Sequence, residues 1–270
     1  MNPFLGQVVH SIPVGREPFG GAVNTSTNKI YVANFVSNSV SVIAGASVVA
    51  TIPLTGYGEP TYVAVNEITN RVYVPLHVGG RLAVINDATD TLIAAVDVCP
   101  GAFGVAVDPT SNRIYVSCRE AQKIVVVDGA TNTVLPNEFA YLGGIPYALG
   151  IDPGLGQFYV SFAGDPSDPL APRQVLVFRV PSITPSPIGS VLVGAGGSDG
   201  GGGVANPTTH HVFVTNSLDD NVPKFDGVSF MVLDTIPVGD DPHCAAVDPG
   251  LGYIYVGNRM SDTVSPIPDW

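Results

Sequence analysis

One phrase recurs along the chain at a nearly constant interval, and this repeat limits the possible folds more than any other feature. The central aromatic of "IYV" and its variants falls at six places: Tyr31, Tyr73, Tyr115, Tyr159, Phe213 and Tyr255. The successive intervals are 42, 42, 44, 54 and 42 residues. A period near 42 is typical of a propeller blade of four short strands. Helical repeats would show a period of 3.6, whereas these segments alternate or run as short apolar bursts.

The unit from Ala102 to Gly143 shows how one blade would form. Its first segment, "AFGVAV", is rich in small residues and fits an innermost strand, where blades converge on the axis. The turn "DPTSN" follows, in which Asp108 can accept backbone hydrogen bonds and Asn112 tolerates a left-handed conformation. "RIYVSC" and "KIVVVD" give the second and third strands, and "TVLPNEFAYLG" carries the outer strand.

The two ends of the chain indicate how the ring closes. The last unit has three strands, and the N-terminal "GQVVHSIPVG" matches the outer-strand phrase "FMVLDTIPVG" at 230–239. We therefore expect residues 6–14 to complete the last blade, which would remove two exposed sheet edges. The prediction is an all-β, six-bladed propeller in a single domain, with four-stranded antiparallel blades at 18–57, 60–98, 102–143, 146–194, 200–239 and 242–268 plus 6–14.

Composition supports a folded chain and excludes some partners. Hydrophobic residues make up 45% of the sequence, which a disordered chain would lack. The net charge of −12 argues against binding to nucleic acid, because an acidic protein gains nothing from counterion release. No stretch reaches the ~20 apolar residues that a membrane span needs. We expect no membrane insertion, no resident cofactor and a monomer, while a divalent metal stays open.

The three cysteines, Cys99, Cys118 and Cys244, are too few for a disulfide scaffold, and no pair has metal-motif spacing. Cys99 and Cys118 flank one hairpin. A disulfide between them and a pair of small buried thiols are both open readings.

The repeat phrases resemble a known family. "IYVAN" (30–34), "TNRVYV" (69–74), "VDPTSNRIYV" (107–116), "FVTN" (213–216) and "IPVG" (12–15, 236–239) resemble the YVTN-type β-propeller repeats over essentially the whole chain. The resemblance implies a secreted or surface-layer interaction module, in which seven blades are common. A more distant likeness is to the virginiamycin B lyase type of propeller, whose chemistry uses histidine, glutamate and a divalent ion. None of those residues can be matched here one by one.

Two positions of the repeat vary where the rest of the unit changes little. One lies near the start of each inner strand, and the other lies four residues after the central aromatic. Both should lie at the mouth of the central channel. A structural role should repeat in every blade, whereas a ligand role need not. The candidate ligand-binding residues are therefore Phe19, Phe103, Tyr147, His77, Arg119, His243 and Arg259. His77 and His243, with loop carboxylates, are the candidate metal ligands, although no local ligand spacing supports them. No nucleophile motif is present, and catalytic residues stay unknown.

Three functions remain open on the sequence alone. The first is a binding scaffold whose unknown protein or small-molecule ligand docks on the face carrying the enlarged loop at 163–174, "AGDPSDPLAPRQ". The second is a metal-dependent lyase or hydrolase with its site at the channel mouth, and the third is a structural surface protein. The family resemblance implies an extracellular or cell-surface location. Since the sequence contains no signal peptide, a cytoplasmic location stays open.

Overall fold

The computed structural model describes residues 10–140, 144–163, 172–180, 187–195 and 200–270. Blade 1 contains β1 (Pro18–Asn24), β2 (Lys29–Asn34), β3 (Ser39–Ala44) and β4 (Ser47–Pro53). Blade 2 contains β5 (Ala64–Asn66), β6 (Arg71–Leu76), β7 (Arg81–Asn86) and β8 (Thr91–Asp97). Blade 3 contains β9 (Ala102–Asp108), β10 (Arg113–Cys118), β11 (Lys123–Asp128) and β12 (Thr133–Ala140).

The second half of the chain repeats this arrangement. Blade 4 contains β13 (Ile145–Asp152), β14 (Gln157–Ala163), β15 (Pro172–Arg179) and β16 (Gly189–Ala195). Blade 5 contains β17 (Gly200–Ala205), β18 (His211–Asn216), β19 (Asn221–Asp226) and β20 (Val232–Pro237). Blade 6 contains β21 (Pro242–Asp248), β22 (Tyr253–Asn258) and β23 (Thr263–Pro268).

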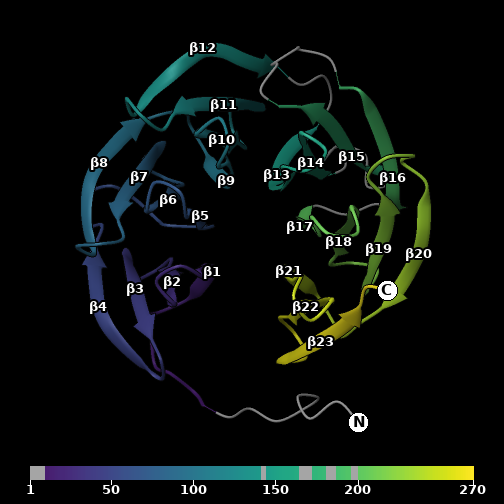
Figure 1. Cartoon of the computed structure of the whole chain (residues 1–270), viewed down its shortest axis with the longest axis horizontal. Coiled ribbons are helices and arrows are strands. Elements are labelled where there is room, and N and C mark those ends of the chain that lie inside the picture. Colours follow the sequence, from purple (N-terminus) through teal and green to yellow (C-terminus); the bar gives the residue numbers. More distant parts are fainter. Residues whose placement is uncertain (1–9, 141–143, 164–171, 181–186, 196–199) are drawn as a thin grey trace.

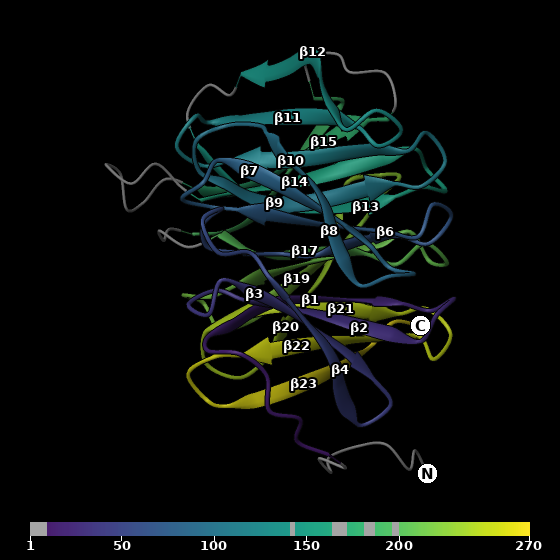
Figure 2. The ribbon, with the colours of Figure 1, turned by 90° about the vertical axis from the view of Figure 1, so that its left-hand side faces the viewer.

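Each blade is an antiparallel sheet in which the strands follow one another in sequence order. Figure 1 shows the six blades around a central axis, with the first strand of each blade nearest to it. Figure 2 shows the ring from the side, with the outer strands β4 and β8 toward the viewer. The prediction of an all-β, six-bladed propeller is confirmed. Among the described residues, no helix is long and apolar enough to span a membrane.

The core lies between neighbouring blades, and the repeated aromatic occupies it. Tyr31, Tyr73 and Tyr115 are fully buried on their second strands, and Phe213 is buried in the same way. Valine and isoleucine fill the positions around them, because β-branched side chains suit a sheet covered on both faces. Burying one such aromatic contributes about 2–3 kcal/mol, so the six-fold recurrence is a requirement of packing rather than of chemistry.

The turns follow from the polar residues between the first two strands. Asn28, Asn70 and Asn112 adopt φ of 54°, 50° and 52° at the end of these turns, the left-handed conformation that asparagine tolerates. The carboxylate of Asp108 accepts a hydrogen bond from the Thr110 amide at 3.0 Å. Both roles expected for the "DPTSN" turn are present.

Blade 6 differs from the others because its sheet has three strands among the described residues. Val264 on its third strand is 63% exposed, whereas the equivalent Val40, Leu82, Ile124 and Val222 are fully buried. Residues 10–14 form no strand, and residues 6–9 lie outside the described residues. The pairing of residues 6–14 with this blade therefore stays a prediction.

Candidate functional site: the mouth of the central channel

The links between blades and the turns after the second strands lie on one face of the ring, here called the mouth face. Backbone hydrogen bonds join link and turn in four blades, from Phe35 to Glu17, His77 to Glu59, Arg119 to Gly101 and Arg259 to Asp241, at 2.8–3.0 Å. These bonds hold the start of the inner strand beside the turn that follows the second strand. The two variable positions of the repeat are therefore brought together by the backbone.

A β-bulge near the start of the inner strand aims one side chain at the mouth. The pairing of β1 with β2 shifts register between Pro18 and Gly21, and the inner strands of blades 3, 4, 5 and 6 show the same irregularity. A bulge adds a residue to one strand and redirects its side chain. Phe19, Phe103 and Tyr147 occupy this position in three blades.

Six of the seven candidate residues form one contact network at the mouth. The Phe103 ring lies 5.5 Å from the rings of Phe19 and Tyr147. The His77 ring packs 5.8 Å from Phe103, and the His243 ring packs 5.8 Å from Phe19. Arg119 lies over Phe103. Phe103 and Tyr147 are the buried members of this network, and Phe19 packs against them. Whether these residues bind a ligand stays a prediction.

A cavity of about 690 Å³ opens beside this network, between blades 6 and 1. Aromatic side chains of Phe19 and Tyr62 form part of its wall. Ionisable side chains complete it, those of Glu17, Asp262, His243 and Arg259. The Asn258 side-chain oxygen is buried and has no hydrogen-bond partner, while its Nδ2 donates to Thr263 and Ser265. An apolar wall with a few polar groups is the composition of a typical ligand pocket.

Tyr62 belongs to this site and was missed in the sequence. Its ring packs 5.4 Å from Phe19 and 5.6 Å from Phe103, and it also lines a narrower cavity of about 220 Å³ along the axis. Burial raises the pKa of its hydroxyl. A signal was present, because the equivalent positions in the other blades hold Gly20, Gly104, Ala148, Gly202 and Cys244. Tyr62 is the one large side chain at a position that is otherwise small.

The charged candidates differ in their partners. The Arg259 Nε lies 2.6 Å from the Asp241 carboxylate. The His243 Nδ1 lies 3.8 Å from Asp241, and the His77 Nδ1 lies 3.8 Å from Glu59. The Arg119 guanidinium donates a hydrogen bond of 2.5 Å to the Tyr147 hydroxyl.

His77 and His243, the predicted metal ligands, pack against two different phenylalanines of the network. The part of the chain that the structure describes contains no group of three or more His, Cys, Asp or Glu side chains placed to share a metal ion. The metal prediction therefore has no ligand set to support it.

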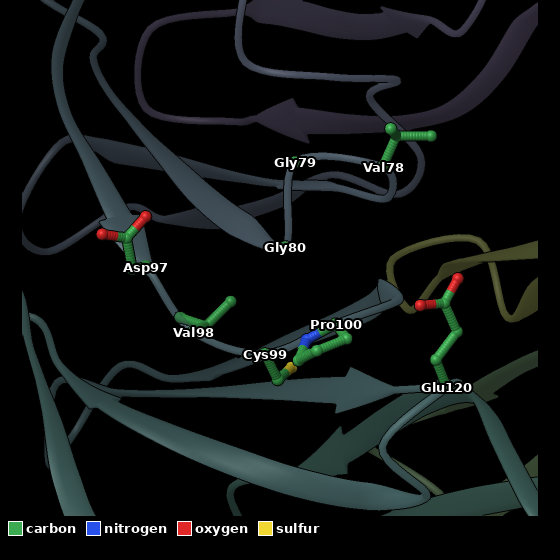
Figure 3. A pocket seen from close by; sticks show the side chains of 8 residues that line it. All are labelled: Val78, Gly79, Gly80, Asp97, Val98, Cys99, Pro100 and Glu120. Atoms are coloured by element: carbon green, nitrogen blue, oxygen red, sulfur yellow. The ribbon is translucent and has the colours of Figure 1, made fainter.

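Cys99 and Cys118 form a disulfide, with their Cα atoms 5.9 Å apart, and this answers the question that the sequence left open. It joins the link after blade 2 to the second strand of blade 3. A cavity of about 430 Å³ lies beside Cys99, with the carboxylates of Asp97 and Glu120 at its two ends (Figure 3). This cavity has no aromatic wall, and its Asp97 is paired with Arg81 at 2.6 Å. It is a poorer ligand site than the mouth cavity.

Cys244 is the free cysteine of the chain, and it lines the mouth cavity. Cys244 is exposed at the surface, but the protein atoms crowded around its thiol partly desolvate it and raise the pKa of the thiol. A raised pKa keeps the thiol protonated at neutral pH, which disfavours a role as nucleophile. The enlarged loop at 163–174 lies mostly outside the described residues, so its place on the mouth face stays a prediction.

The comparisons with known proteins support the fold. No family model matches the chain, and no curated protein matches it. A hydrazine synthase chain from Kuenenia stuttgartiensis is similar in structure with a TM-score of 0.68 and 12% identity, over 97% of this chain and 99% of that one. A "putative 6-phosphogluconolactonase" from Bacteroides uniformis gives a TM-score of 0.77 and 15% identity, over 95% and 82%. At these identities the likeness shows the propeller fold alone.

Proposed function

We propose that the chain is a binding scaffold that holds a ligand at the mouth of its central channel. The observation that supports this proposal is the mouth cavity of about 690 Å³, where the aromatic wall of Phe19 and Tyr62 meets His243 and Arg259. Ligand sites combine apolar burial with a few polar groups that fix orientation. The blades hold the backbone around these residues, and the side chains at the mouth vary from blade to blade.

The kinship with YVTN-type repeats is part of this proposal. Its support is the set of repeat phrases, since no family model matches. A secreted or surface location is also proposed, and a single disulfide is weak support for it. The metal-dependent lyase or hydrolase and the purely structural protein stay alternatives, and no contact among the described residues favours either.

We further propose that residues 6–14 supply the fourth strand of blade 6. The link that follows this segment already resembles the link into blade 6. The Arg16 amide donates to Ser37 Oγ at 2.6 Å, as the Asp240 amide donates to Ser261 Oγ at 3.0 Å. A strand along β23 would pass Thr263 and Val264, which line the cavity. Ring closure would narrow the cavity from outside and leave its axial part, with Phe19 and Tyr62, open.

The binding proposal is tested with small aromatic probes, benzoate and its neutral analogue benzamide. We expect probe-dependent shifts of the amide resonances of Asn258 and Arg259, saturating in the millimolar range typical of fragments, with Kd on the order of 1 mM. Phe19→Ala should weaken probe binding about fivefold or more, because it removes an aromatic wall. Trp270→Ala is the matched control, since Trp270 is an exposed aromatic against the Gly252 turn. Absence of any saturable shift with both probes would contradict a binding site at the mouth.

A further inference from the structure

The guanidinium of Arg119 packs against two aromatic rings at the centre of the mouth network. It follows β10, and its guanidinium carbon lies 4.6 Å from the centre of the Phe103 ring and 4.1 Å from that of Tyr147. Both rings are buried and Arg119 itself is partly buried. Interaction with aromatic faces partly offsets the cost of removing this cation from water.

Two other arginines near the mouth have carboxylate partners, whereas Arg119 has none among the described residues. Arg259 pairs with Asp241, and Arg81 pairs with Asp97, both at 2.6 Å. Among the described residues, Arg119 forms no ion pair, and its one side-chain hydrogen bond goes to the neutral Tyr147 hydroxyl. In a protein of net charge −12, carboxylates are abundant. An unpaired, partly desolvated guanidinium retains N–H donors and a strong preference for an anion.

We propose that Arg119 is the anchor for the carboxylate of an organic ligand whose apolar body lies on the aromatic wall of the mouth. This inference rests on the proposed binding function and names the class of ligand. A guanidinium offers parallel N–H donors that match the two oxygens of a carboxylate, and the aromatic rings beneath it hold the fork in place.

A single ring connects Arg119 to the wall of the mouth cavity. The Phe103 ring touches both Arg119 and Phe19, and Phe19 forms part of the cavity wall with Tyr62. A flat aromatic acid could therefore lie against Phe19 while its carboxylate meets Arg119 across Phe103. The Glu59 carboxylate lies 3.8 Å from His77 Nδ1, so it faces this histidine.

The test measures the affinity of the folded chain for benzoate and benzamide by amide chemical shifts. The two probes have the same ring and differ in charge. The ratio of their dissociation constants therefore measures the contribution of the anion site. We expect benzoate to bind about tenfold or more tightly than benzamide, and Arg119→Gln to bring the affinities for the two probes together. Arg119→Lys keeps the positive charge but loses the parallel N–H donors of the guanidinium. It should therefore retain part of the preference for benzoate over benzamide.

Arg71→Gln is the matched control, because Arg71 lies at the start of β6 on the opposite face and contacts the Asn70 carbonyl at 3.2 Å. It should leave both affinities unchanged. Equal affinity for the two probes, or a benzoate preference that survives Arg119→Gln, would contradict the role of Arg119 as carboxylate anchor. Neither result would contradict the proposed binding function. No binding of either probe would overturn both. Thermal unfolding of each variant separates loss of the site from loss of the fold.

Discussion

Single carboxylates join neighbouring blades on the face opposite the mouth. Asp87 and Asp269 each follow the third strand of a blade, a position held by Gly45, Gly129 and Gly227 elsewhere. The Asp87 carboxylate accepts a hydrogen bond from the Tyr31 hydroxyl of the preceding blade. The Asp269 carboxylate likewise reaches blade 5. The two acids therefore fasten two of the inter-blade seams.

Asp269 has the denser set of partners. Lys224 Nζ lies 2.8 Å from it and His211 Nδ1 lies 2.6 Å from it. Asn206 and Thr209 donate at 2.7 Å and 2.6 Å. Burial alone would raise the pKa of Asp269, but the hydrogen bonds from Lys224, Thr209, His211 and Asn206 outweigh it and lower the pKa to about 2. The carboxylate thus stays ionised although its side chain is fully buried.

We predict that Asp269→Asn lowers the free energy of unfolding at pH 7 by about 2–4 kcal/mol, because Lys224 loses its buried counterion. The folded-state pKa lies below the ordinary value of 3.8. The stabilisation is therefore fully present above about pH 4 and is lost as the pH falls through about 2. Thermal unfolding from pH 7 to pH 2 should show the gap between wild type and variant closing in acid. Asp234→Asn, on an exposed strand, is the control, and a pH-independent gap would contradict this account.

Residue-level prediction succeeded where a role is local and failed where it spans blades. The turn at Asp108 and Asn112 was predictable because its hydrogen bonds stay within a few residues. His211 gives no such signal, since its Asp269 partner lies 58 residues away. Tyr62 was missed because only comparison across all six inner strands shows that it is out of place.

At the scale of the strand, small residues allow the inner strands to approach one another. A Cβ atom added at Gly104 would lie 2.2 Å from the Tyr147 carbonyl oxygen of the next blade and 2.9 Å from Ser117 Oγ. The Ser117 hydroxyl donates to that same carbonyl at 2.6 Å and accepts from the Gly104 amide at 2.7 Å. The glycine is therefore required by a backbone-to-backbone contact between blades 3 and 4.

We expect Gly104→Ala to destabilise the protein by about 2–3 kcal/mol, because a backbone contact this close cannot relax by rotation of a side chain. Gly203→Ala is the matched control on another inner strand, where the added Cβ would meet only Val214 at 3.9 Å. Urea unfolding of both variants measures the difference. An equal loss of stability in the two variants would show that crowding between blades 3 and 4 does not govern the effect at Gly104.

The strands themselves were predictable because periodic apolar bursts and turn residues repeat with little change. The exception is β5, which spans only Ala64–Asn66 while Pro60 forms an isolated bridge with Leu76. Thr61 lies outside the regular strand, and its hydroxyl donates a hydrogen bond of 2.6 Å to the Phe103 carbonyl of the next blade. A contact of this kind depends on how blades pack, which a sequence period does not encode.

At the scale of the whole molecule, the described residues leave a cavity of about 690 Å³ at the seam between blades 6 and 1. Tyr255 on β22 is partly exposed, whereas its equivalents in blades 1 to 5 are buried. On the outer strand of blade 5, Val232 is 45% exposed, whereas the equivalent Val48 and Leu92 are half-buried. A fourth strand in blade 6 would cover these surfaces. The period predicted six blades, but it could not establish whether the last seam is paired.

Closure by residues 6–14 makes a measurable prediction. Amide hydrogens of β23 should exchange at least about tenfold more slowly than those of an unpaired edge, because they would lie between two strands. Ile12 is equivalent to Ile236, which packs against the core of blades 5 and 6. Ile12→Asp should therefore lower stability by about 2 kcal/mol and speed that exchange. Val49→Asp, at an exposed outer-strand site, is the control. Fast exchange along β23 in the wild type would show an open ring.

The Cys99–Cys118 bridge occupies two positions that recur at two other blade junctions. Gly15 with Asn34 and Gly239 with Asn258 stand at the same spacing of 19 residues, and in both pairs the glycine lies against the asparagine side chain. The same fold thus accepts either a disulfide or a glycine–asparagine contact at equivalent positions between blades. The rigidity of each joint can be altered by exchanging two residues, without redesigning the sheets on either side.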